Sequence, residues 1–348
     1  MSENGAVFIG TSNHGFAQQA QEEIRRLFGG AVKYQWLVPG EVFLARLEEA
    51  SWEETVRVVT ESEPVFLRHL HPVNGQEAWN GSLESLVEAL REKLVRHSAI
   101  AAGGERVAVQ VRKTEHAAPG VSPSSVKHAL DEVLTVKPGI VPVVREAEWI
   151  ISLFLTEDLI YWGISRPSDN LSDWPGGAVR YRKEEGQVSR AKFKLLEAEQ
   201  TFGLDFTQYR AALDVGAAPG GWTSLLLERG LDVTAIDPAK LDPGVLKHPK
   251  LTYYQKNAGD VKLKPDSFDL LVCDMSWSPR QMMKLIQGLL YSLKPGGTAI
   301  ITLKLMHGKA LQSLREATED FEPQLSLQKA KQLFHNREEL TLFLVKNG

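Results

Sequence analysis

The amino-acid sequence predicts an α/β protein: a Rossmann-like, doubly wound and mainly parallel sheet, preceded by an α+β N-terminal domain. Three observations support this fold class. From Val188 onward, apolar stretches of strand length alternate with stretches of helix length. A glycine-rich turn, Gly216–Gly221, follows the first of these apolar stretches. The first half of the chain mixes strand and helix patterns and has no such turn.

The C-terminal pattern defines the predicted sheet. Helical patterns, such as residues 222–229, separate most of its strand candidates, and this alternation is typical of parallel strands joined by crossover helices. We therefore expect the doubly wound domain to cover residues 188–348. The strand candidates are 213–215, 231–236, 251–254, 269–273, 298–303 and 340–345.

Residues 1–165 predict a separate α+β domain. Helix patterns begin near Phe16, Ser51, Gly81 and Ser122, and a hairpin is expected at Glu157 and Asp158. Proline, glycine, serine and aspartate are frequent in the segment that follows, so we expect a linker over residues 166–187. Within residues 1–165, the strand candidates are 7–10, 41–47, 64–72, 107–111, 149–155 and 159–164.

Length and charge limit the possible partners. A chain of 348 residues favours two domains. Its net charge is −4, but residues 1–165 hold 15 Lys and Arg against 22 Asp and Glu, whereas residues 166–348 hold 25 against 22. Neither part has the strongly basic balance of many nucleic-acid-binding domains, so any contact with RNA must come from a local patch.

The N-terminus, the apolar runs and the cysteine count indicate a cytoplasmic protein. The N-terminus lacks the basic and apolar regions of a signal peptide, and runs such as 149–155 are too short to cross a bilayer. The single Cys273 excludes an internal disulfide framework, and His69, His71 and His116 lack metal-site spacing. We therefore expect no membrane partner and no metal. The oligomeric state cannot be inferred from these features.

The turn after residues 213–215 has the composition of a ligand site. Glycines at a strand-to-helix turn let a ligand approach the backbone, at the sheet edge where such folds bind ligands. The next strand ends in Asp237, whose carboxylate can accept hydrogen bonds from ribose hydroxyls. Enzymes that bind NAD use the same geometry. However, Ala218 departs from Gly-x-Gly-x-x-Gly, and Pro219 has no N–H for a pyrophosphate, so a dinucleotide is disfavoured.

The segment Asp214–Trp222 resembles motif I of the FtsJ-like ribosomal RNA 2′-O-ribose methyltransferases. Further resemblances follow in the family's order over about residues 185–348: Ser189–Leu195 is similar to the entry motif, and Val272–Met275 is similar to motif IV. Leu303–Leu305 and Arg337–Leu340 resemble the last two catalytic strands. The resemblance implies S-adenosyl-L-methionine as cofactor and an RNA ribose as methyl acceptor.

Within this family, the sequence is most similar to the RlmM branch. The stretch that begins at Phe334, and an Asp-Met motif without a following Ala-Pro, carry that similarity. Members of the branch methylate a cytidine ribose in large-subunit ribosomal RNA and have an N-terminal THUMP domain, which binds RNA. Residues 1–165 resemble such a domain. The resemblance thus implies RNA, and ribosomal RNA in particular, as the partner.

Four residues match the family's Lys-Asp-Lys-Glu catalytic set: Lys194, Asp274, Lys304 and Glu339. A ribose hydroxyl must lose its proton as it attacks the methyl group, and a lysine can accept that proton if desolvation or a second cation lowers its pKa. The resemblance implies Lys304 as this base and Lys194 as the second cation. Asp274 would orient the base and the ribose, and Glu339 would hold Lys194 or the nucleotide.

Some assignments have neighbouring alternatives. Lys192 competes with Lys194, and Glu338 competes with Glu339, because strand alternation lets only one of two adjacent residues face the site. Asn257 stands where the family often has an aspartate that contacts adenine, with Asp260 nearby. Trp222 also suits helix packing. The residues expected to bind the cofactor are Ser189, Gly216, Ala218, Pro219, Gly220, Gly221, Trp222, Asp237, Asn257 and Asp274.

A local basic patch is expected around the entry motif. Tyr181 lies among its cations, as in surfaces that bind an RNA backbone, although a solvated helix face has the same composition. The cations are Arg180, Arg182, Lys183, Arg190 and Lys192.

Two other functions remain open from the sequence. Asp274-Met-Ser-Trp277 partly resembles the Asp-Pro-Pro-Trp motif of amino-methyltransferases, so methylation of a base is one alternative, although both prolines are missing. The other is a non-catalytic RNA-binding or assembly factor with a methyltransferase fold. Asn257, Ser276 and Trp277 depart from the family pattern and permit it, whereas the four catalytic matches argue against it.

Overall fold

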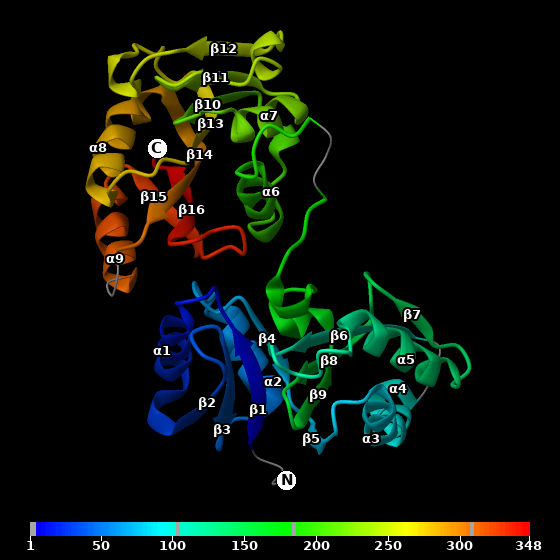
Figure 1. Cartoon of the computed structure of the whole chain (residues 1–348). Helices are drawn as coiled ribbons and strands as arrows, with labels where there is room; N and C mark the ends of the chain where they lie inside the picture. The colour runs from blue at the N-terminus through cyan, green and yellow to red at the C-terminus, as the bar shows by residue number, and fades with distance from the viewer. Residues whose placement is uncertain (1–4, 102–104, 183–185, 307–309) are drawn as a thin grey trace. The chain divides into compact units, whose positions relative to one another are not determined.

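The structure, a computed structural model of the chain, describes residues 5–101, 105–182, 186–306 and 310–348. The chain divides into two compact units, Met1–Ala178 and Val179–Gly348 (Figure 1). Each unit has its own sheets and hydrophobic core and is described by itself. Within the described residues, no helix is both long enough and apolar enough to cross a membrane.

The unit Val179–Gly348 is built on a seven-stranded sheet with the strand order β12-β11-β10-β13-β14-β16-β15. β16 runs antiparallel to both of its neighbours, and the pairs from β12 to β14 are parallel. This arrangement confirms the predicted doubly wound α/β fold. The strands are β10 (Ala211–Val215), β11 (Asp232–Ile236), β12 (Leu251–Tyr254), β13 (Phe268–Cys273), β14 (Leu293–Lys304), β15 (Leu325–Lys331) and β16 (Glu339–Lys346).

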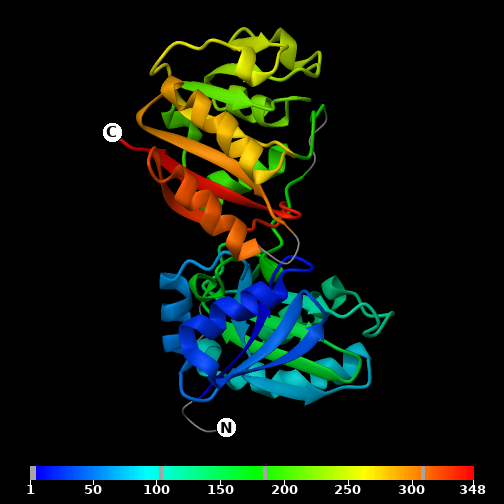
Figure 2. The same ribbon diagram turned by 90° about the vertical axis from the view of Figure 1, so that its left-hand side faces the viewer.

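Helices cover both faces of this sheet. α6 (Lys192–Thr201) and α7 (Gly221–Glu228) lie on one face, and α8 (Pro279–Leu289) and α9 (Ala310–Phe321) lie on the other (Figures 1 and 2). Burial of apolar side chains holds these layers together. The core between the sheet and α6 and α7 includes Leu195, Ala198, Leu225, Leu226, Val233, Leu270, Val272 and Ile300.

The strand order reverses at β10. The chain runs from β10 to β11 and β12 on one side of the sheet and then crosses to β13 on the other side. Val215 and Cys273, the last residues of β10 and β13, are paired in register, so both strands end at the same edge. In open α/β sheets, ligands bind in the crevice beyond the strand ends at such a reversal. The fold therefore places a binding site where the glycine-rich turn begins.

The unit Met1–Ala178 contains two sheets, with the orders β2-β3-β1-β4 and β5-β9-β8-β6-β7. β8 and β9 form the predicted antiparallel hairpin. The strands are β1 (Ala6–Thr11), β2 (Val32–Val38), β3 (Val42–Leu47), β4 (His69–Pro72), β5 (Gly75–Ala78), β6 (Arg106–Lys113), β7 (Val141–Val143), β8 (Trp149–Leu155) and β9 (Leu159–Ser165). The helices are α1 (Ala17–Phe28), α2 (Trp52–Glu61), α3 (Leu83–Arg96), α4 (Ser98–Ala101) and α5 (Pro123–Thr135).

Two of the apolar clusters that stabilise this unit lie wholly among the described residues. One packs α3 and α5 against the five-stranded sheet, with Leu86, Leu90 and Leu130 fully buried. The other joins the two sheets through side chains such as Ile9 and Phe154. The unit is therefore α+β, as the sequence predicts.

The predicted strand 64–72 is shorter in the structure. Only His69–Pro72 is a strand, because the backbone N–H groups of Val65, Phe66 and Leu67 donate to the carboxylate of Glu23 at 2.8–3.1 Å. A side chain distant in the sequence satisfies donors that a strand would pair with another strand. Sequence patterning also did not indicate β2, β5, β7 or β15.

Part of the segment expected as a linker is folded. Residues 167–170 and 175–177 form short 3₁₀ helices, and side chains of the first unit bind this segment. The Gln110 amide donates to the Asp173 carbonyl at 2.6 Å, and Arg68 Nε donates to the Gly176 carbonyl at 3.0 Å. The first unit accordingly extends to Ala178.

Gly163 of β9 offers a direct test of the packing in the first unit. A Cβ at this position would overlap the carbonyl oxygen of Pro72 in β4. We expect Gly163→Ala to destabilise the unit by about 3 kcal/mol, because the backbone must move to relieve the overlap. Thermal unfolding followed by circular dichroism measures the effect. Gly120→Ala is the matched control, since nothing lies within 4 Å of a Cβ there, and equal melting temperatures for the two variants would contradict the expectation.

Candidate active site

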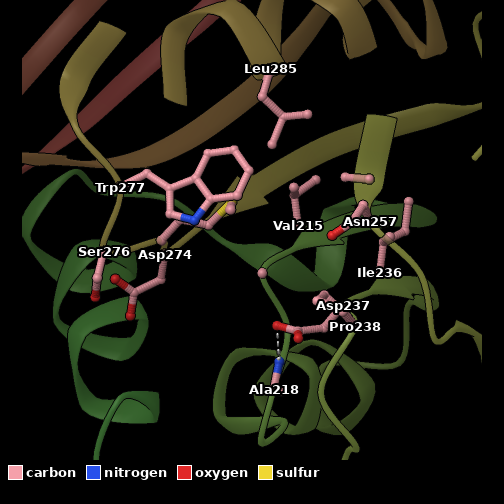
Figure 3. A pocket seen from close by; sticks show the side chains of 13 residues that line it. Val215, Ala218, Ile236, Asp237, Pro238, Asn257, Asp274, Ser276, Trp277 and Leu285 are labelled. Atoms are coloured by element: carbon pink, nitrogen blue, oxygen red, sulfur yellow. Dashed lines mark hydrogen bonds between the residues drawn. The ribbon is translucent and has the colours of Figure 1, made fainter. Parts of the chain in front are cut away.

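A pocket lies at the strand-order reversal, beyond the ends of β10, β11 and β13 (Figure 3). The space free of protein atoms in and around it is about 710 Å³, and part of this space is open solvent. Most of its wall is apolar, and a few polar groups point inward, as is typical of a ligand site. The pocket is lined by Val215, Gly216, Ala218, Ile236, Asp237, Pro238, Asn257, Ala258, Asp274, Met275, Ser276, Trp277 and Leu285.

The glycines of the turn have distinct structural roles. Gly216 has a φ of +78°, and a Cβ there would overlap the Met275 side chain, so only glycine lets the two strand ends approach this closely. Gly220, with a φ of +116°, precedes the first residue of α7. A Cβ on Gly221 would lie 3.0 Å from the Cβ of Ser189, so the helix start packs tightly against the entry motif. The turn thus shapes the pocket floor and brings α6 close to it.

Asp237 is the anionic group at one end of the pocket. Its carboxylate accepts a hydrogen bond from the N–H of Ala218 at 3.0 Å (Figure 3). It also accepts one from the N–H of Ala239 at 2.7 Å. These two donors fix the carboxylate while its remaining lone pairs can accept hydrogen bonds from ligand hydroxyls. Asn257 also lines the pocket, and its side-chain amide lies 3.5 Å from the carboxylate of Asp260. Asp260 itself is not among the lining residues.

A cluster of charged side chains adjoins the pocket at Asp274. Lys194 Nζ lies 2.8 Å from the carboxylates of both Asp274 and Glu339. The Thr302 hydroxyl donates to Asp274 Oδ1 at 2.9 Å and completes the orientation of that carboxylate. The three charged side chains are only 15–18% exposed. The cluster joins the start of α6, the end of β13 and the start of β16.

The two carboxylates determine the charge of Lys194. Burial by itself would lower the pKa of Lys194, but the attraction of Asp274 and Glu339 and their hydrogen bonds outweigh it, and the net pKa is raised. Lys194 is therefore an ammonium ion at neutral pH. It can orient carboxylates and stabilise negative charge, but it cannot accept a proton.

Lys304 is the last residue of β14 and pairs in register with Glu339 of β16. Residues directly opposite each other in an antiparallel pair project to the same face. Lys304 is exposed, in contrast to the buried cluster beside it. The structure thus brings Lys194, Asp274 and Glu339 into contact and places Lys304 next to them on the solvent side.

The structure also distinguishes the neighbouring alternatives. Lys192 is buried and pairs with Glu228 at 2.7 Å, so it is not part of the charged cluster. Glu338 is exposed, and its backbone carbonyl accepts a hydrogen bond from Leu305. Of the two adjacent glutamates, Glu339 is the one that contacts Lys194.

Half of the expected cofactor-binding residues line the pocket, and half do not. The lining residues are Gly216, Ala218, Asp237, Asn257 and Asp274. Trp222 is buried, and its indole N–H donates to the Ala191 carbonyl at 2.8 Å, which is a packing role. The Ser189 hydroxyl accepts from the Ala191 N–H at 3.1 Å. The expected residues that do not line the pocket are Ser189, Pro219, Gly220, Gly221 and Trp222.

Sequence reasoning missed several apolar residues of the pocket wall, among them Ile236, Pro238, Met275 and Leu285. Most of them lie next to a predicted polar residue, and that adjacency was the available signal. Trp277 entered the sequence argument only through the two alternative functions, amino-methylation and a non-catalytic factor. Trp277 lines the pocket (Figure 3), and 45% of its surface is exposed.

Comparisons with known proteins agree with these motifs. Residues 187–331 match the family model of the FtsJ-like methyltransferases. The ribosomal RNA large subunit methyltransferase M of Halorhodospira halophila is 35% identical over 49% of this chain and 50% of its own length. That of Xylella fastidiosa is 36% identical over 56% of this chain and 57% of its own. The chain spans about half the length of these curated relatives.

Two solved structures are similar at lower identity. TrmN from Thermus thermophilus is 15% identical, with a TM-score of 0.40, over 98% of this chain and all of that one. A 1,6-didemethyltoxoflavin-N1-methyltransferase from Burkholderia thailandensis is 16% identical, with a TM-score of 0.36, over 47% of this chain and 80% of that one.

Asp214, beneath the glycine turn, is a buried acid with one polar partner in the core. It is 1% exposed, and its Oδ2 accepts a hydrogen bond from the Thr223 hydroxyl at 2.6 Å. Burial raises the pKa of Asp214 to about 7, and the negative charges of Asp274 and Asp237 add to the effect. The folded chain therefore keeps this proton at pH values where the unfolded chain has lost it.

Asp214 predicts a pH dependence of stability. Between about pH 4 and pH 7, Asp214 ionises only in the unfolded chain. Its contribution to the free energy of unfolding therefore falls by up to about 1.4 kcal/mol per pH unit as the pH rises. Asp214→Asn stays neutral, and we expect it to gain stability relative to wild type from pH 5 to pH 8. Melting temperatures at the two pH values measure this.

Asp205→Asn is the control for this measurement. Asp205 is fully exposed, and its hydrogen bond to Thr207 lowers its pKa, so both of its states are ionised across this range. The difference from wild type should stay constant for Asp205→Asn. The same constancy in Asp214→Asn would contradict the assignment of a buried, protonated acid.

Proposed function

We propose that this protein is an S-adenosyl-L-methionine-dependent methyltransferase that methylates a ribose 2′-hydroxyl of RNA, and that ribosomal RNA is its substrate. One observation carries the proposal. Lys194, Asp274 and Glu339 are in contact beside the pocket, with Lys304 opposite Glu339. These are the four positions that match the catalytic set of the FtsJ-like enzymes, and they come from four separate segments. The match of residues 187–331 to that family supports the same activity.

The pocket suits a nucleoside cofactor that has no pyrophosphate. Asp237 offers an oriented carboxylate to the ribose hydroxyls, and Asn257 offers both a donor and an acceptor to an adenine edge. The backbone at Gly216 can approach the ligand closely because no side chain intervenes. Bound there, S-adenosyl-L-methionine supplies an activated methyl group on a positively charged sulfur.

In the proposed reaction, the 2′-hydroxyl oxygen forms a bond to the methyl carbon while the bond from that carbon to sulfur breaks. Lys304 Nζ would accept the hydroxyl proton, and S-adenosyl-L-homocysteine would be the second product. Lys304 is exposed in the free protein, so the bound RNA would cover it and remove water from the amine. Because the methyl group is already activated, the main task of the protein is to hold the two reactants in line.

The buried cluster orients this reaction. Asp274 is fixed by Lys194 and by the Thr302 hydroxyl, so its carboxylate has a defined direction toward the pocket. Glu339 links the same ammonium ion to the strand position opposite Lys304. Lys194 keeps both carboxylates close without mutual repulsion. We assign it a positioning role, because its raised pKa leaves it protonated.

We propose further that the first unit is a THUMP-like RNA-binding domain, which would deliver the substrate to the second unit. Its α+β architecture supports this assignment. An enzyme that modifies ribosomal RNA would work in the cytoplasm. Nucleoside analysis of ribosomal RNA methylated by the purified protein tests the reaction, with RNA from cells that lack the gene as substrate. A methylated base in place of a 2′-O-methylated ribose would refute the proposal.

Lys304→Ala tests the general base. We expect methyl transfer to fall by at least about 10³-fold, since base catalysis of this kind contributes roughly 10²–10⁴-fold. Binding of S-adenosyl-L-homocysteine, measured by calorimetry, should remain within about twofold of wild type, because Lys304 does not line the pocket. Wild-type turnover by this variant would show that Lys304 is not the base.

Asp237→Ala tests the cofactor site, because this variant should lose cofactor binding, which Lys304→Ala should retain. Loss of two charge-assisted hydrogen bonds to ribose should weaken S-adenosyl-L-homocysteine binding by about 100-fold. RNA binding should stay unchanged, since the residue lies at the other end of the pocket from the charged cluster. Unaltered cofactor affinity in Asp237→Ala would show that the cofactor does not bind in this pocket. Asp232→Ala is the matched control, because Asp232 is exposed and does not line the pocket.

A further inference from the structure

Three aromatic rings pack together on the surface beside the charged cluster, and a fourth, that of Phe334, meets the His335 ring edge-on with centroids 5.1 Å apart. The ring centroids of Tyr181, Phe193 and His335 are 5.3–5.5 Å apart, and Tyr181 and His335 are stacked with an interplanar angle of 24°. All three residues are partly exposed. The reaction proposed above makes no use of them. We call these three residues the ring cluster.

Hydrogen bonds hold the ring cluster in place. Glu197, buried in α6, accepts from the backbone N–H groups of Phe334 at 2.7 Å and His335 at 2.9 Å. The Tyr181 hydroxyl donates to Gln200 Oε1 at 2.9 Å. These contacts fix two of the rings before any ligand arrives, which reduces the entropy lost when a ligand stacks on them.

The ring cluster is connected directly to the proposed reaction centre. Phe193 immediately precedes Lys194 in α6, and His335 lies four residues before Glu339. Both therefore belong to segments that supply the charged cluster. A nucleotide next to the target ribose would lie within reach of the rings.

Exposed arginines lie within a few residues of the three rings in the sequence. Arg180 and Arg182 flank Tyr181, and Arg337 is two residues from His335. Arg190 caps the turn that leads into Phe193, whose N–H donates to the Arg190 carbonyl. The structure therefore revises the predicted basic patch. Lys192 is not part of the patch, because it is buried and pairs with Glu228. Arg337 is added to the patch, and Lys183 lies outside the described residues.

We propose that the ring cluster stacks an unpaired nucleobase of the RNA next to the target nucleotide, while the exposed arginines near it in the sequence bind the adjoining phosphates. Aromatic faces flanked by arginines are the usual means of holding single-stranded RNA, since a base within a duplex has no free face for a side chain. The inference rests on the proposed function for the identity of the strand. It adds that the strand is unpaired at this point and names the side chains that hold it.

The competing explanation is purely structural: the rings only fasten residues 179–182 to α6. The two explanations differ in what Tyr181 contributes. A fastening role needs apolar volume, whereas stacking needs an aromatic face. Tyr181→Phe keeps both, Tyr181→Leu keeps only the volume, and Tyr181→Ala keeps neither.

Binding of fluorescein-labelled RNA to the full chain separates these cases. The probes are an unstructured 12-nucleotide oligouridine and a 12-base-pair RNA duplex. We expect Tyr181→Leu and Tyr181→Ala to weaken oligouridine binding by about tenfold, as for the loss of one stacked base, and Tyr181→Phe to bind within about twofold of wild type. Duplex binding should change by less than twofold in every variant. His335→Ala should repeat the pattern of Tyr181→Leu.

Calorimetry with S-adenosyl-L-homocysteine and melting temperatures show whether each variant is folded. If Tyr181→Leu is folded and binds oligouridine like wild type, or if duplex binding falls equally, the stacking proposal is overturned. These binding assays involve no methyl transfer. The proposed function fails separately, if the wild-type protein transfers no methyl group to ribosomal RNA.

Discussion

The contact of one ammonium ion with two carboxylates is the constraint on which the C-terminal unit depends. Lys194 joins α6 to the end of β13 and the start of β16, and each of these segments also forms part of the pocket or adjoins it. Loss of the lysine would leave two partly buried carboxylates facing each other, at a cost of about 3–5 kcal/mol. The same contact keeps Lys194 protonated, so stability and the proposed division of catalytic roles have one physical origin.

The strand-order reversal supplies the second constraint. Because β10 and β13 end side by side, Gly216 and Met275 are forced together, and a cavity opens beyond them. Asp237 enters this cavity from the neighbouring strand with its carboxylate already oriented by two backbone donors. The cofactor pocket and the charged cluster then share Asp274. One residue at the end of one strand thereby couples the proposed methyl donor to the proposed acceptor site.

The proposed RNA surface follows from the same helix that supplies Lys194. Successive residues of α6 face different neighbours: Phe193 meets the rings, Lys194 meets the carboxylates, and Glu197 binds the loop before β16. A strand of RNA held by the rings would therefore be positioned relative to the reactive hydroxyl by a single rigid element. This arrangement would link the proposed binding of RNA to the proposed reaction through one helix.

By itself, the sequence determined the alternating fold, the glycine turn and Asp237 at the second strand end, because period and turn chemistry are local properties. The catalytic set came from resemblance, and no spacing rule could have joined residues 194 and 339. Only the tertiary structure decided that Lys192 pairs with Glu228 and that Glu339 faces Lys194. It also decided that Trp222 packs in the core and that Glu23 replaces a strand partner. These outcomes depend on which segments come into contact in the folded chain. Local sequence patterns do not encode contacts between residues that are far apart in the sequence.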